Sequence, residues 1–84
     1  MRTRELRALI DAGAIKVVHL IGDGGSVYAE FHTRTGKAVA LTDKGQVKTW
    51  QTLDAAAKWL RGLGIGKARL EISQWLPDQR VLRL

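Results

Sequence analysis

The clearest pattern of apolar and polar positions lies between residues 52 and 73. Apolar residues recur there at helical spacing while charged residues fall on the other side of the helix: Leu53, Ala56, Ala57, Leu60 and Leu63 against Asp54, Lys58 and Arg61. Thr52 is suited to cap this helix, because its hydroxyl can accept an unpaired backbone N–H, and the glycines at 62, 64 and 66 end it. Residues 67–73 then alternate strictly, which predicts a half-buried strand.

The residues before this segment predict a helix and a series of short strands. Residues 2–12 have the spacing of an amphipathic helix that Gly13 closes. Residues 15–21 are β-branched and apolar at both parities, as in a central strand or one covered on both faces. Residues 26–33 alternate, and turns at 34–37 and 43–46 separate the further strands expected at 38–42 and 47–50.

These elements together predict an α+β fold formed as a single domain over residues 1–84. The order is helix, four strands, helix and strand, with a bend at Pro77-Asp78 before a last edge strand or loose tail at residues 80–84. Three consecutive hairpin turns, at residues 23–25, 34–37 and 43–46, indicate an antiparallel meander sheet. The two helices are most simply packed together on one face of that sheet, which leaves the other face open.

Composition limits the class of protein. The chain has 84 residues and no cysteine, so disulfides are excluded and a reducing compartment, the cytoplasm, is expected. Charged residues interrupt every apolar run near the N-terminus, so we expect no signal peptide, no membrane span and no membrane partner. A chain this short buries only about 60% of its unfolded surface, which favours a homodimer.

The chain is strongly basic, with a net charge of +6 and an isoelectric point near 10.3. Residues 34–48 and residues 58–71 each carry a net +3, whereas residues 17–33 carry −2. Such a balance favours a nucleic acid or an acidic protein surface as the partner. Solubility alone is the other explanation of the excess charge.

Catalytic chemistry is poorly represented. The chain has two serines, two histidines and no cysteine, and no nucleophile stands beside a base. His19 and His32 fall in neighbouring strands and could bind a metal together with Glu30 or Asp23, but we expect His19 to face away from the other two. The prediction is therefore no enzyme, no cofactor and no metal site.

The glycines at 62, 64 and 66 do not form a phosphate-binding loop. Such loops follow a strand and open a helix, so that the positive end of the helix dipole meets the phosphate. In this sequence the helix ends at the glycines, and its negative end would repel a phosphate. Capping and a tight connection to the next strand explain these glycines.

The aromatic residues suggest a binding surface. Trp59 is expected to pack against the sheet and Trp75 to hold down the C-terminal segment. Trp50 shares strand parity with Lys48, which predicts that it points outward near Tyr28 and His32. Aromatic rings interleaved with lysines on an open sheet face are typical of single-stranded nucleic-acid binders. The candidate nucleic-acid-binding residues are Tyr28, His32, Arg34, Lys37, Lys44, Lys48, Trp50, Lys67 and Arg69. The alternative is that the aromatic residues lie in a dimer interface or a second small core.

Three segments of the chain resemble a known family. The segment at residues 4–13, with Leu53-Asp54-Ala55-Ala56 and the segment at residues 60–64, resembles the small ParC-type partition-associated proteins of bacterial plasmids and integrative elements. The resemblance implies an accessory protein of a mobile element that binds DNA or a partner protein.

The function we predict is a non-enzymatic nucleic-acid-binding module, for single-stranded or non-sequence-specific DNA. The alternative is a protein-interaction adaptor or inhibitor that acts through the open sheet face or an edge strand, as a homodimer.

Overall fold

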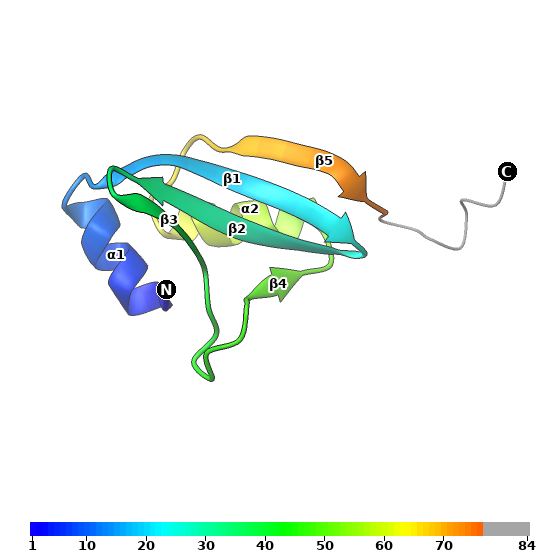
Figure 1. Cartoon of the computed structure of the whole chain (residues 1–84), viewed down its shortest axis with the longest axis horizontal. Coiled ribbons are helices and arrows are strands. Elements are labelled where there is room, and N and C mark those ends of the chain that lie inside the picture. The colour runs from blue at the N-terminus through cyan, green and yellow to red at the C-terminus, as the bar shows by residue number, and fades with distance from the viewer. Residues whose placement is uncertain (77–84) are drawn as a thin grey trace, which may run out of the picture.

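The computed structural model describes residues 1–76 and has the α+β fold that the sequence predicts (Figure 1). Two helices and five strands follow one another in the predicted order. They are α1 (Thr3–Asp11), β1 (Ile15–Gly24), β2 (Ser26–Thr33), β3 (Gly36–Val39), β4 (Thr49–Trp50), α2 (Leu53–Gly62) and β5 (Arg69–Trp75). The bend and strand expected after residue 76 lie outside the described residues.

The sheet is mostly antiparallel, with the strand order β3-β2-β1-β5. A two-residue turn, Gly24-Gly25, joins β1 to β2 and places Asp23 opposite Ser26. The turn at 43–46 does form, because Leu41 and Val47 pair across it, but β4 then pairs with β2 in line with β3. The second departure from a simple meander is β5, which runs parallel to β1. A parallel neighbour requires a crossover, and α2 supplies it.

Local sequence explains why α2 begins and ends where it does. The Thr52 hydroxyl accepts the backbone N–H of Ala55 at 3.1 Å, which confirms the predicted cap. Gly62 is the last helical residue, and Gly64 takes the left-handed conformation (φ 94°) that ends the helix. The Ile65 N–H then donates to the Leu60 carbonyl at 3.0 Å, which turns the chain toward β5.

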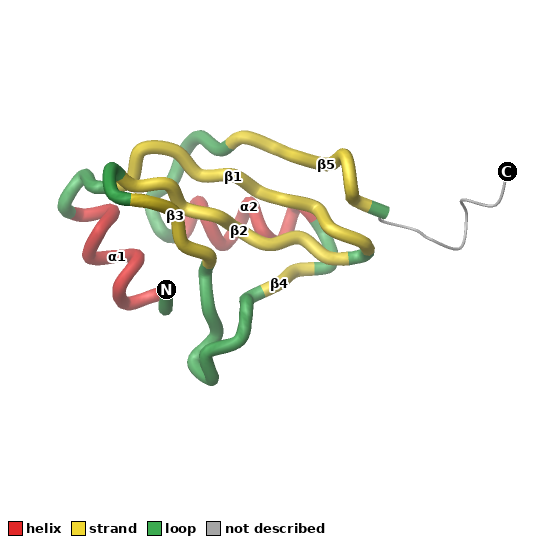
Figure 2. The backbone as a smooth tube through the Cα atoms, in the orientation of Figure 1, coloured by secondary structure: helices red, strands yellow, loops and turns green. Residues whose placement is uncertain are grey.

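Side chains from both helices and from one face of the sheet form the core. Its buried members are Leu6 of α1, Val18 and Leu20 of β1, Val27, Ala29 and Phe31 of β2, Ala56 and Leu60 of α2, and Ala40 and Leu63, which follow β3 and α2. Trp59 meets Phe31 edge-to-face, with ring centroids 6.3 Å apart, which confirms its expected packing role. Figure 2 shows α2 passing behind β1 and β2, so one face of these strands is covered and the other faces the viewer.

Trp75 packs against the margin of the core at the end of the sheet that carries the β1–β2 turn. It is half-buried against the core and lies directly over Gly22, where a side chain would collide with its ring. The next residue, Leu76, donates its N–H to the Gly24 carbonyl. Trp75 therefore holds the C-terminal end of β5 against β1, as predicted. Within the described residues, neither helix has the length and apolar character that a membrane crossing requires.

Candidate binding surface on the open sheet face

The open face of the sheet is formed by alternate residues of its two longest strands. On β2, Tyr28, Glu30 and His32 alternate with the three buried core residues, and all three are half-buried. The β1 residues opposite them are Ile21, His19 and Val17, in that order. Because directly opposed residues point to the same side of a sheet, these six side chains share one surface.

Basic side chains lie at both edges of this open face. Lys37 of β3 stands opposite His32, and Arg69 of β5 stands opposite His19. Lys16 and Lys67 line a shallow hollow together with Val17 and Arg69, which adds two cations on the side of the open face nearest β5. Glu30 of β2 lies between these cations, and Glu71 of β5 stands opposite Ile21 on the same rim as Arg69. The centre of the open face is thus close to neutral and its rims are positive.

Six of the nine predicted binding residues lie on or beside the open face. The open face brings together Tyr28, His32, Lys37 and Arg69, with Arg34 in the adjoining turn and Lys67 just before β5. Lys44 lies apart, exposed in the turn at residues 42–46. Sequence reasoning missed Lys16, whose position at a bulge in β1 has no signal in the local pattern.

Trp50 does not lie on the open face, so the prediction that it points outward near Tyr28 and His32 was wrong. It stands opposite Val27, a core residue, and packs against Trp59 with ring centroids 5.0 Å apart. The Lys48 ammonium lies 5.7 Å and 5.8 Å from the centroids of the two rings. Trp50 and Lys48 therefore belong to the helix-covered side of the sheet, as an extension of the core capped by a cation–π contact.

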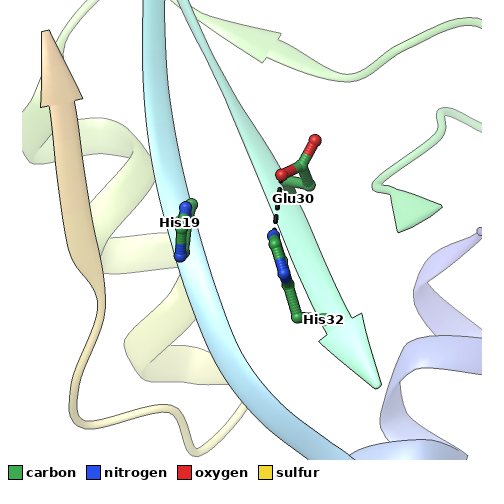
Figure 3. Close-up of side chains that lie close together, drawn as sticks. All are labelled: His19, Glu30 and His32. Atoms are coloured by element: carbon green, nitrogen blue, oxygen red, sulfur yellow. Dashed lines mark hydrogen bonds and ion pairs between the residues drawn. The ribbon is translucent and has the colours of Figure 1, made fainter. Parts of the chain in front are cut away.

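His19 does lie on the same face as Glu30 and His32, so the expectation that it points away was also wrong. Figure 3 shows the three side chains together, His19 from β1 and the other two from β2. The His32 Nε2 and Glu30 Oε1 atoms are 2.7 Å apart, and the two imidazole rings stack at 4.4 Å with an angle of 22° between their planes. The signal was present in the sequence. In a hairpin with a two-residue turn, positions equally far from the turn are paired, and His19 and Glu30 are each five residues from it.

A second exposed surface runs along β5, the last strand of the sheet in the described part of the chain. The prediction that this strand is half-buried was wrong, because Leu70 and Ile72 are 53% and 49% exposed although Leu70 stands beside the buried Leu20. The reason is that α2 packs behind β1 and β2 and leaves the apolar side of β5 uncovered (Figure 2). A shallow apolar groove separates the start of β5 from α2, and Lys58, Arg61 and Lys67 line its margin. We call this surface the β5 edge.

Comparison with known proteins adds no further constraint. No protein-family model, curated protein or solved structure matches this chain. The two surfaces described above are therefore the basis for assigning a function.

Proposed function

We propose that this protein is a non-enzymatic binding module that holds single-stranded or non-sequence-specific DNA on the open sheet face, in a cytoplasmic setting. The observation that carries the proposal is the half-exposed row of rings, Tyr28 with the two imidazoles, on a face with cations along both rims. Bases stack on rings without regard to sequence, and phosphates are held by basic side chains beside them.

Each group on the open face has a distinct part in this proposal. Tyr28 is the main stacking platform, because it is the largest ring on the face and lies beside the apolar Ile21. Lys37 and Arg69 hold phosphates on opposite sides of the ring row. The neutral centre limits purely electrostatic binding, so affinity should depend on rings as well as on charge. The resemblance to ParC-type partition-associated proteins agrees with a DNA-binding accessory protein of a plasmid or mobile element.

The test is a fluorescence titration with single-stranded and duplex oligonucleotides at two salt concentrations. Tyr28→Ala should weaken single-strand binding about 5- to 150-fold, which corresponds to about 1–3 kcal/mol for one stacked base. Tyr28→Phe keeps the ring and should bind like the unaltered protein. If Tyr28→Ala binds oligonucleotides as well as the unaltered protein does, the open face is not the binding surface.

A second candidate function, capture of another protein chain, is favoured by the β5 edge. The sequence of this strand is self-complementary: two copies paired antiparallel about Leu70 would place Arg69 opposite Glu71 of the second copy. The same register would place Ala68 opposite Ile72 of the second copy, so that exposed apolar residues would become covered. In this second candidate function, the captured chain is another copy of the protein, and the two sheets join through their β5 strands into one continuous sheet.

Sedimentation at micromolar concentration tests the homodimer. Leu70→Glu should convert dimer to monomer, because it brings two carboxylates together at the centre of the proposed interface. Val47→Glu is the matched control, since Val47 is 46% exposed and lies in the turn region far along the chain from β5. A monomer at every concentration, or equal effects of the two variants, would remove the homodimer.

A further inference from the structure

We propose that His19, Glu30 and His32 form a binding site for a divalent first-row transition metal ion, with Zn²⁺ as the reference ion. One ligand atom from each of the three side chains lies within 4.8 Å of the others. The three side chains project from two paired strands onto one surface (Figure 3). The site shares its two imidazoles with the proposed DNA-binding face, but this inference does not rest on DNA binding, because metal coordination needs no phosphate or base contact.

The donor set selects the class of metal. Two imidazole nitrogens and one carboxylate oxygen suit Zn²⁺, Ni²⁺ and Cu²⁺, whereas Ca²⁺ and Mg²⁺ require six or more oxygen ligands. Three protein ligands also leave at least one coordination position for water or an external ligand. The chain contains only two histidines, and both are in this cluster.

Only small rearrangements separate the observed cluster from a metal-bound one. In tetrahedral coordination with bonds of about 2.0–2.1 Å, ligand atoms are about 3.3 Å apart. The 2.7 Å contact between His32 Nε2 and Glu30 Oε1 would open slightly, and the widest separation of 4.8 Å would close. The stacked rings must also turn about their Cβ–Cγ bonds, since one ion cannot lie in two nearly parallel ring planes. Those torsions are broad, while the hairpin backbone keeps its register.

The surroundings permit this rearrangement. The side chains of His32 and Glu30 are 27% and 19% exposed, so an ion can reach them from solvent and the rings have room to turn. Within the described residues, neither ring nitrogen of His19 has a hydrogen-bond partner, so both remain available as donors to a metal. Arg69 and Lys37 are the cations opposite the two histidines, and both are exposed, so their charged ends can move away into water.

Calorimetric titration of the full chain, free of any polyhistidine tag, tests the proposal. Zn²⁺ and Ni²⁺ should bind with one ion per site, while Mg²⁺ and Ca²⁺ should not bind at the same concentrations. His19→Ala, His32→Ala and Glu30→Gln should each lower the Zn²⁺ affinity by at least about tenfold, the lower end of the cost of losing even an outer-shell partner. Glu71→Gln is the matched control, because it removes a carboxylate from the same face outside the cluster.

A second measurement on the unaltered protein keeps the test independent of whether the variants fold. Zn²⁺ should shift the NMR signals of both histidine rings together, at the same metal concentration. Absence of Zn²⁺ binding, binding that leaves either ring signal unmoved, or an equal loss in Glu71→Gln would overturn the proposal. Because no oligonucleotide is present, loss of DNA binding and loss of metal binding remain distinguishable.

Discussion

The two faces of β1 and β2 are made by alternate residues of the same two strands, yet they have opposite properties. The helix-covered face consists of aliphatic and aromatic side chains that are almost completely buried, such as Val27 and Phe31. The open face carries Tyr28, Glu30 and His32 in the positions between them, all half-exposed. Burial of apolar area stabilises the fold through the first face, and polar groups that remain in reach of solvent make the second face available for binding.

Because the two faces differ in this way, substitutions of adjacent β2 residues should affect the free energy of unfolding on the covered face but not on the open face. Phe31→Ala should lower the free energy of unfolding by about 3–5 kcal/mol, since it leaves a cavity beneath α2. His32→Ala should change it by less than about 0.5 kcal/mol, as is usual for substitutions away from the core. Urea unfolding of the two variants measures the difference. Similar losses in both would mean that the open face is also structural.

Trp50 tests where the boundary between the two faces lies. Because it packs on Trp59 while remaining half-buried, Trp50→Ala should cost about 2 kcal/mol of stability, less than a fully buried tryptophan. Oligonucleotide affinity measured below the unfolding transition should not change. A variant with unaltered stability and weakened DNA binding would instead assign Trp50 to the binding surface.

Gly22 tests how far the covered face extends beyond α2. A methyl group there would collide with Trp75, so Gly22→Ala should displace the end of β5 and cost about 1–2 kcal/mol. Gly25→Ala is the control, since a side chain there meets nothing within 4 Å. Tryptophan fluorescence and urea unfolding report the two effects. Equal behaviour of both variants would show that Trp75 does not hold β5 in solution.

The smallest expected effect concerns the rims of the open face. If Lys37 holds a phosphate, Lys37→Ala should reduce the slope of log affinity against log salt by about 0.7 for single strands. Lys58→Ala is the matched control, because Lys58 lies on the exposed side of α2 and, among residues 1–76, forms an ion pair with Asp54 at 3.2 Å. Salt slopes that fall equally in both variants would indicate binding by overall charge and not by this face.

The sequence by itself was sufficient to predict the order of helices and strands and the features that depend on neighbouring residues. The cap at Thr52, the helix end near Gly64 and the alternation along β2 each depend on residues within one or two turns of chain. The register of the β1–β2 hairpin was also encoded locally, through the two-residue turn, and applying it would have placed His19 beside Glu30. The wrong expectation for the direction of His19 therefore did not come from missing information, because the two-residue turn in the sequence already implied the pairing.

Only the tertiary structure decided the placement of Trp50 and of β5. An apolar residue stands at both odd and even positions of the segment Val47-Lys48-Thr49-Trp50, so its local pattern does not specify which side faces the core. The pairing of Trp50 with the core residue Val27 specifies it. The alternation along residues 67–73 predicts a half-buried strand without indicating its neighbour. The position of β5 beside β1, and its parallel direction, follow from where the α2 crossover packs. Local periodicity specifies which residues share a face, whereas contacts between distant segments specify what each face meets.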